Sequence, residues 1–398
     1  MNKGSENNER DYYLSAEEYS TLDPDEIKEW VPLSKKYERV PIWCIVALSF
    51  AAFCGILYLL FCISPAFADF FNLYISGAVR MVFAKVTGIL PFSVAEACLI
   101  LIPVFLFLII RYIWRYRCNT GKSTLVTIVC ILSVVSLFFS QFVVCFSAGY
   151  RGRGLDDKLG FKVEEVSKEE LYDSAVYLIK EINSLVPEIE YGEDHFSIMP
   201  YSLAKMNDKL IDAYDSFAKK HDFIWSFDSN LKPVLLSEGL SYMHITGVYT
   251  FFTGEANINI AFPDYTIPNT AAHELSHQRG IAKEDEANMM AFLVCMESDD
   301  TYIRYSALLS IFEDVSNALY YADRGLLKKV NSVLDVRVYN ELVAKNNFFK
   351  KYQDSVSSQV SGTVNDIYLQ SQGTVGRRSY GMVVDILVAY LKEEKHIK

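Results

Sequence analysis

Residues 273–280 of the chain read HELSHQRG, and this stretch determines the fold around it. On a helix, positions i and i+4 lie on one face, so His273 and His277 can both reach a single metal ion at about 2.0–2.1 Å. Glu274 stands beside the first histidine, where its carboxylate can hold a water molecule and take its proton. The stretch therefore predicts a helix that carries two metal ligands and a general base.

The spacing is HExxH, the pattern with which zinc hydrolases bind a catalytic ion. Zn²⁺ lowers the pKa of a bound water from about 15.7 towards roughly 7, so that the water becomes a nucleophile at neutral pH. In this interpretation Glu274 is the base and not a ligand. The alternative is a solvated pair of histidines, but the chain has only six histidines in 398 residues, which makes a chance match rare.

The residues on both sides of the motif indicate a short helix. Pro268, Asn269 and Thr270 predict a turn and an N-cap just before the motif. Gly280 predicts a left-handed C-terminal end. A catalytic zinc site needs a third protein ligand, and Lys283, where a third histidine stands in the HExxHxxGxxH arrangement, is no ligand at neutral pH.

An acidic run follows the motif and opens a second predicted helix. It resembles the gluzincin pattern ExxxD, in which a glutamate of the second helix is the third ligand and the residue four positions on orients a ligand histidine. Glu284 and Asn288 have that spacing, with asparagine in place of aspartate. The resemblance implies Glu284 as the third ligand, with Glu286 as its rival. Carboxylates in a first helical turn are also favoured by the helix dipole alone.

A wider resemblance covers most of the chain. The chain resembles the DUF3810 family, bacterial membrane-anchored, zincin-like proteins of unknown function. The resemblance implies a membrane-bound zincin-like fold with Zn²⁺ as cofactor, and it implies no substrate. The stretches that carry it are GILPFS (88–93), GEANIN (254–259), HELSHQRG (273–280), EDEAN (284–288), Tyr305-Ser306 and SYG (379–381).

The first part of the chain predicts three membrane spans. Each apolar run approaches the length that crosses roughly 30 Å of hydrocarbon. We therefore expect an acidic cytoplasmic tail (1–41), a transmembrane region (42–150) with helices at about 42–63, 92–114 and 123–148, and an outer domain (151–398). Lys35, Lys36 and Arg39 before the first span, and four basic residues between the second and third, place the N-terminus in the cytoplasm and the outer domain outside it.

The segment between the first two spans, residues 67–90, mixes aromatic and aliphatic side chains with few charges. It is expected either as an amphipathic helix along the outer membrane surface or as a collapsed loop.

The outer domain is predicted to be mostly helical, of α+β class. Ser167 and Glu170 form a capping box, and helical periodicity covers 169–186, 202–220, 302–322, 333–353 and 380–392. Strand signal falls on 249–260. The gluzincin resemblance implies that 254–259 is an edge strand that pairs with an extended peptide, and the alternative is a structural strand. Cys295 is expected in the core.

A tetrahedral intermediate needs a donor near the developing oxyanion. Tyr305 is the predicted candidate, with Arg304 and Tyr380 as alternatives, because all three are polar and lie in segments that resemble the family. The opposing interpretation places Tyr305 in the core of an apolar helix.

Together these features predict a membrane-anchored zinc metallopeptidase that hydrolyses peptide or protein substrates outside the cytoplasm, in contact with membrane lipid. The alternative is a non-catalytic zincin-like binding or sensor domain at the cell surface. Intramembrane proteolysis is disfavoured, because Gln278, Arg279 and the acidic run surround the motif with polar side chains. Nucleic-acid binding is not expected, because the net charge is −11 and no basic stripe with interleaved aromatic residues appears.

Overall fold

A computed structural model of the chain describes residues 39–116, 121–352, 356–372, 374 and 382–397. The predicted acidic tail lies almost wholly outside these residues, as does Tyr380.

Three apolar helices are long enough to cross a membrane: α4 (Ile42–Ile63), α7 (Val94–Tyr116) and α8 (Gly121–Cys145). They coincide with the three predicted spans, and their length and composition indicate a membrane protein. The third helix ends three residues before the predicted boundary, because the chain turns at Phe146 into the short 3₁₀ helix η2 (Ser147–Tyr150).

The described chain divides into two compact units. The smaller unit contains the described residues up to Ala51 together with Ile102–Leu137. The larger unit contains Ala52–Leu101 and Phe138–Lys398. The larger unit therefore includes the ends of the three apolar helices and the segment between the first two, not only the residues after 151.

The segment between the first two apolar helices is helical over residues 65–88, which confirms a helix and excludes a collapsed loop. It consists of α5 (Pro65–Phe70), the π-helical turn η1 (Phe71–Ser76) and α6 (Gly77–Gly88). Ser64 caps its start, since its side chain accepts a hydrogen bond from the Phe67 N–H group.

The rest of the larger unit is mostly helical, as predicted. The Ser167–Glu170 capping box is present at the start of α10. Long helices follow at the five predicted places: α10 (Lys168–Leu185), α11 (Leu203–Ala218), α15 (Thr301–Ala322), α17 (Val336–Lys350) and α19 (Val383–Glu393). The other helices are α9 (Leu155–Leu159), η3 (Val186–Glu188), α12 (Ser237–Tyr242), α13 (Thr266–Gln278), α14 (Glu284–Met296), α16 (Arg324–Asn331) and α18 (Val356–Ser371).

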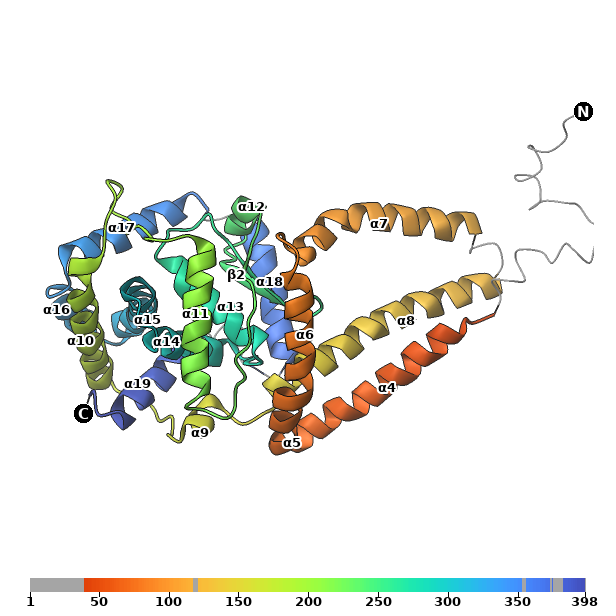
Figure 1. Ribbon diagram of the computed structural model, residues 1–398, viewed down its shortest axis with the longest axis horizontal. Helices are drawn as coiled ribbons and strands as arrows, with labels where there is room; N and C mark the ends of the chain where they lie inside the picture. Colours follow the sequence, from red (N-terminus) through yellow and green to blue (C-terminus); the bar gives the residue numbers. More distant parts are fainter. Residues whose placement is uncertain (1–38, 117–120, 353–355, 373, 375–381, 398) are drawn as a thin grey trace, which may run out of the picture. The chain divides into compact units, whose positions relative to one another are not determined.

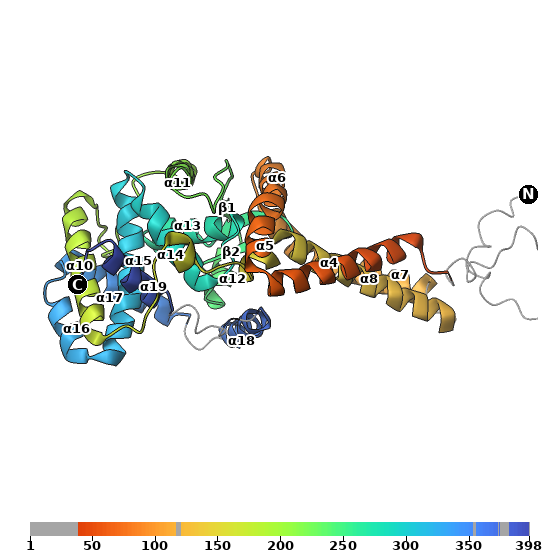
Figure 2. The same ribbon diagram turned by 90° about the horizontal axis from the view of Figure 1, so that it is seen from below.

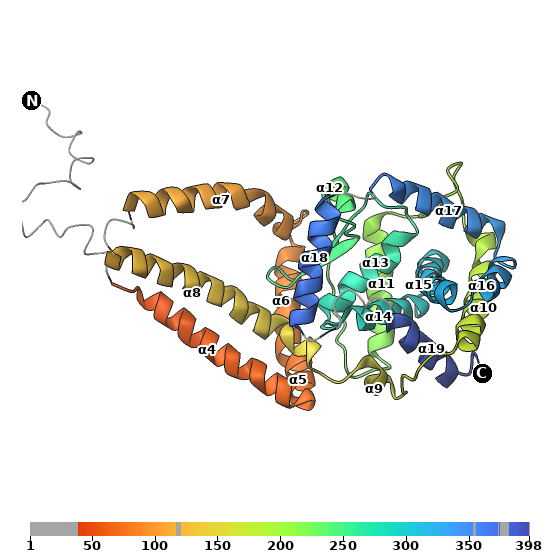
Figure 3. The same cartoon turned by 180° about the vertical axis from the view of Figure 1, so that it is seen from behind.

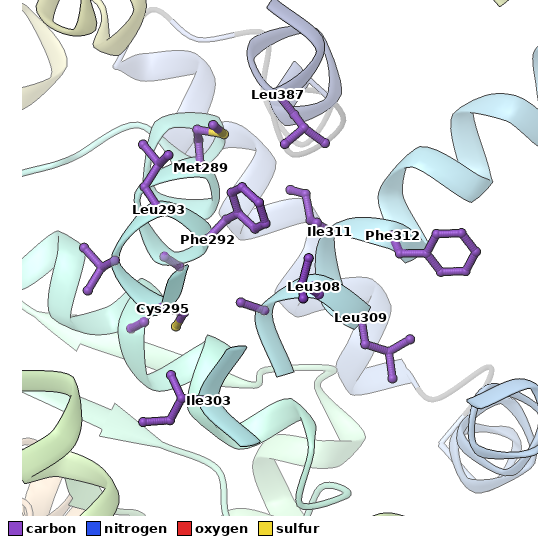
Figure 4. Close-up of a cluster of buried hydrophobic side chains, with 14 of the residues drawn as sticks. Met289, Phe292, Leu293, Cys295, Ile303, Leu308, Leu309, Ile311, Phe312 and Leu387 are labelled. Carbon is purple, nitrogen blue, oxygen red and sulfur yellow. The ribbon is translucent and has the colours of Figure 1, made fainter. Parts of the chain in front are cut away.

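The core of this unit lies where α14, α15 and α19 pack together. Figure 4 shows Phe292 and Cys295 of α14 among side chains of α15, with Leu387 of α19 beside them. Cys295 is fully buried among hydrophobic residues, which confirms its predicted place in the core.

A small sheet lies beside this core. Its strands are β1 (Lys232–Pro233), β2 (Gly247–Thr250) and β3 (Glu255–Ile258), in the order β1-β3-β2. β3 is parallel to β1 and antiparallel to β2. The prediction that residues 254–259 form an edge strand is therefore wrong: β3 is the buried central strand, because β1, more than 20 residues upstream, pairs with its other side.

Helix α13 packs against this sheet. Figure 1 shows α13 and β2 near the end of α8, and in Figure 2 they lie between α11 on one side and α18 on the other. The motif helix packs against α11, a segment far from it in sequence.

Candidate metal centre

Helix α13 carries the HELSHQRG motif, and its end is set by a glycine. Gly280 has φ +100°, its N–H donates to the His277 carbonyl, and the Ile281 N–H donates to the Ser276 carbonyl. These two bonds form a Schellman motif, which confirms the predicted left-handed end. The chain then enters α14 after three residues, so both helices meet at this turn.

The start of α13 differs from the prediction. The helix begins at Thr266, and Pro268, Asn269 and Thr270 lie inside its first turns and not before it. Proline is tolerated there because the first N–H groups of a helix have no intrahelical partner. Asn269 instead donates a side-chain hydrogen bond to Ser310 on α15.

The turn brings three ligand atoms together. The Nε2 atoms of His273 and His277 lie 3.0 Å apart, and the Oε2 atom of Glu284 lies 3.2 Å from the first and 3.5 Å from the second. Ligands about 2.0–2.2 Å from one tetrahedral metal ion are separated by roughly 3.3–3.5 Å. The three atoms therefore have nearly the spacing of three corners of a tetrahedral site.

Glu284, and not its rival Glu286, faces the histidines. The Glu286 carboxylate accepts a hydrogen bond from Lys283 Nζ at 2.7 Å and another from the Leu155 N–H group. The Glu286 carboxylate is therefore hydrogen-bonded to α9 and to the residue before α14, away from the two histidines.

The His277 ring is oriented for ligation. Its Nδ1 atom lies 2.7 Å from the Ile281 carbonyl oxygen, which can only accept, so in the neutral ring Nδ1 carries the proton and Nε2 presents its lone pair. The predicted orienting role of Asn288 is not seen, since among the described contacts it bonds to neither histidine. His273 Nδ1 is buried without a partner.

The charges of the centre are strongly coupled. Burial disfavours both charged forms, but the attraction between Glu284 and His277 outweighs it. The pKa of His277 rises to about 9, and the pKa of Glu284 falls well below its usual range. The Glu284 carboxylate thus stabilises a positive charge on the His277 ring.

Glu274 lies against the backbone of β2. A Cβ atom on Gly247 would come within 2.6 Å of Glu274 Oε1, so this position requires glycine. The Glu274 side chain is buried and its Oε2 atom has no hydrogen-bond partner. Burial raises the pKa of Glu274, and the neighbouring imidazoles and the Tyr249 N–H group lower it in part.

An aromatic wall closes the centre on the side of α8. The Phe146 ring lies 6.0 Å from the His277 ring and 5.3 Å from the Tyr249 ring. The Tyr150 hydroxyl donates to the Tyr368 hydroxyl at 3.2 Å. Burial and the Glu284 charge raise the pKa of Tyr368 to about 12. Figure 3 shows its helix α18 on the face of the molecule turned toward the viewer.

The structure does not bring Tyr305 to the candidate metal ligands. Its buried hydroxyl donates to Glu341 Oε2 at 2.5 Å and accepts a hydrogen bond from Tyr191. Sequence reasoning missed Gly247, Phe146, Tyr249 and Tyr368. Only Gly247 had a local signal, since glycine inside a strand often marks a close approach.

These features define a mostly helical membrane protein with a candidate metal centre of two histidines and one glutamate. The DUF3810 family, described as a protein of unknown function, matches residues 71–388, and the chain belongs to this family. No curated protein and no solved structure matches the chain.

Proposed function

We propose that this protein is a membrane-anchored zinc metallopeptidase with a gluzincin-type, zincin-like fold. His273, His277 and Glu284 would hold the ion. The observation that carries the proposal is the mutual spacing of 3.0–3.5 Å among their three ligand atoms, with a buried glutamate next to them in sequence.

The ligand set suits Zn²⁺. Two imidazoles and one carboxylate leave one of four tetrahedral positions open, as in catalytic zinc sites. Zinc, when bound, supplies an activated water and polarises the carbonyl of a peptide bond. Cys295 is buried in the apolar core. Among the described residues, the three atoms that would bind the ion are therefore two imidazole nitrogens and one carboxylate oxygen.

Glu274 would move the proton. Its carboxylate accepts the proton of the attacking water as the new C–O bond forms, and it returns the proton to the amine nitrogen as the C–N bond breaks. A raised pKa makes it a stronger base. An unpartnered buried carboxylate oxygen next to the ligands favours hydrolysis over a purely binding or sensing role.

Strand β2 replaces β3 as the edge that would hold an extended substrate. The Asn259 N–H donates to the Thr246 carbonyl, so by antiparallel alternation Gly247 and Tyr249 direct their backbone groups away from β3. Gly247 also contacts Glu274. A peptide added along this edge would therefore pass the proposed base.

The distribution of basic residues supports an orientation with the metal centre outside the cytoplasm. Lys35, Lys36 and Arg39 precede the first span, and the short loop between the second and third is also basic. Arg151, Arg153 and Lys158 follow the third span and weaken this bias a little.

The test compares the wild-type full-length protein with Glu274→Gln in detergent. Each is incubated with peptides derived from a proteome, and new termini are identified by mass spectrometry while zinc is measured per chain. We expect the variant to keep zinc and to lose cleavage by about 10²–10⁴-fold. Equal cleavage by both proteins would contradict the role of Glu274.

A further inference from the structure

In the α5–α6 segment (residues 65–88) polar side chains are buried and large apolar side chains are exposed. Its polar side chains Asn72, Ser76 and Arg80, spaced four residues apart, are buried. A helix facing water shows the opposite arrangement. Its outward face consists of exposed large hydrophobic side chains: Phe70, Tyr74, Ile75, Val82, Val86 and Ile89, which follows the segment.

Two of the three charged side chains of this segment, Asp69 and Arg80, are directed toward the protein. Asp69 pairs with Arg153 at 2.7 Å and with Lys158 at 3.3 Å. Arg80 is 1% exposed. Lys85 is the one exposed charge among the described residues 65–88, and a lysine can extend its ammonium group from an apolar surface to water.

Arg80 joins the segment to the metal-binding helix. Its guanidinium donates to the carbonyl of Cys145 at 2.7 Å and to the carbonyl of Arg279 at 3.4 Å. Both carbonyls lie at helix C-termini, where the helix dipole favours a cation. Asn72 donates to the Gly280 carbonyl, three residues after His277.

Chain length forces the segment to lie along the membrane. Only Ser64 separates it from α4, and five residues separate it from α7. A helix over residues 65–88 is roughly 35 Å long, whereas six steps of extended chain from residue 88 to residue 94 reach at most about 21 Å. A helix that stood upright could not place both ends at span boundaries.

The sheet fixes the far end of the segment. Buried Lys232 of β1 donates to the carbonyls of Thr87 and Leu90. Buried Glu255 of β3 accepts hydrogen bonds from the N–H groups of Val94 and Ala95 at the start of α7, each at 2.9 Å. The GILPFS turn (88–93) is therefore held rigidly by the same sheet that packs on α13.

We propose that the outward face of the α5–α6 segment is immersed in the headgroup–acyl boundary of the bilayer and holds the metal centre at the membrane surface. The partner is the lipid bilayer, because the face is continuous with two membrane spans and exposes apolar side chains where a water-facing helix exposes charges. If the proposed peptidase activity holds, its substrates are polypeptide segments within reach of the bilayer surface.

The test places the photo-crosslinking residue p-benzoylphenylalanine at Val82 or Val86 in the full-length protein, reconstituted in phosphatidylcholine nanodiscs. The control position is Tyr321 on α15, which is 86% exposed. All three side chains are exposed, so the replacements preserve the fold. After illumination, lipid adducts are measured by mass spectrometry and protein adducts by gel electrophoresis.

We expect lipid adducts at Val82 and Val86 at least about tenfold above those at Tyr321. Adduct yields equal to the control would overturn the proposal, because the face would then be in water. Covalent dimers at Val82 or Val86 without lipid adducts would also overturn it, in favour of a second copy of the chain as the partner. Neither readout depends on hydrolysis, so a failure here is distinct from a failure of the peptidase proposal.

Discussion

The larger unit contains two clusters built around a buried carboxylate, and they differ in their balance of donors and acceptors. Glu341 accepts hydrogen bonds from the Ser197 N–H group, the Ser197 hydroxyl and the Tyr305 hydroxyl. Glu284 instead faces two imidazole nitrogens. The first cluster is complete without any added group, whereas the second directs three electron-pair donors at one point.

This difference separates a structural carboxylate from a proposed metal ligand. Burying a carboxylate costs free energy unless hydrogen bonds or a cation compensate it. Around Glu341 the protein supplies the donors itself. Around Glu284 the hydrogen-bond donors are the two imidazole rings. A ring nitrogen that carries a proton to donate to Glu284 has no lone pair left for a metal ion. The same residue type therefore has opposite roles in the two clusters.

The largest expected effect is on zinc affinity, and it distinguishes Glu284 from the neighbouring Glu286. Glu284→Ala removes one of the three proposed ligands, so we expect the zinc affinity to fall by more than about 100-fold. The matched control Glu286→Ala removes a carboxylate two residues away that pairs with Lys283. Competition with a fluorescent chelator measures both, and equal losses in the two variants would contradict the assignment.

The second effect concerns the satisfied cluster. Glu341→Ala leaves buried donors of Ser197 and Tyr305 without their acceptor, so we expect the free energy of unfolding to fall by about 3 kcal/mol. Thermal unfolding in detergent measures this change. Zinc content per folded chain should stay unchanged, and a loss of zinc from the folded variant would argue against two independent clusters.

The third effect is a dependence of zinc binding on pH. In the metal-free protein His277 has a pKa of about 9, so the ion must displace a proton at neutral pH. We expect zinc affinity to fall about tenfold for each pH unit below 9 over the range where His277 alone is protonated. Isothermal titration in buffers of different ionisation enthalpy counts the released protons, and zero proton release at pH 7 would disagree with this coupling.

The smallest effect compares two tyrosine hydroxyls. Tyr368 lies close enough to Glu284 for that charge to affect its pKa, so Tyr368→Phe should lower hydrolysis at least about tenfold with zinc retained. Tyr305→Phe removes a donor to Glu341 and should lower stability by about 1 kcal/mol without changing hydrolysis. The reverse pattern of rates would restore Tyr305 as the catalytic candidate.

Local signals predicted much of the candidate site. The i and i+4 spacing placed His273 and His277 on one face, and Gly280 ended the helix as expected. The acidic run pointed to Glu284 as a candidate ligand, although spacing alone left Glu286 as a rival. Only the turn between α13 and α14 determines which carboxylate faces the histidines.

The remaining features depend on contacts between distant parts of the chain. Residues 254–259 become a central strand only because β1 pairs with them. Arg80 is buried because the C-termini of two helices meet at its side chain. Both helix ends lie far from Arg80 in the sequence, so no local pattern predicts this contact. The aromatic wall likewise joins Phe146 of the membrane-proximal chain to Tyr249 and Tyr368.

The most direct test of the central claim is zinc stoichiometry by mass spectrometry on the full-length protein purified in detergent. The full chain is needed because the larger unit includes residues 52–101. We predict about one zinc per chain in the wild type and in the control His221→Ala, and none in His273→Ala. A folded wild-type protein without zinc, or zinc that persists in His273→Ala, would contradict the metal centre.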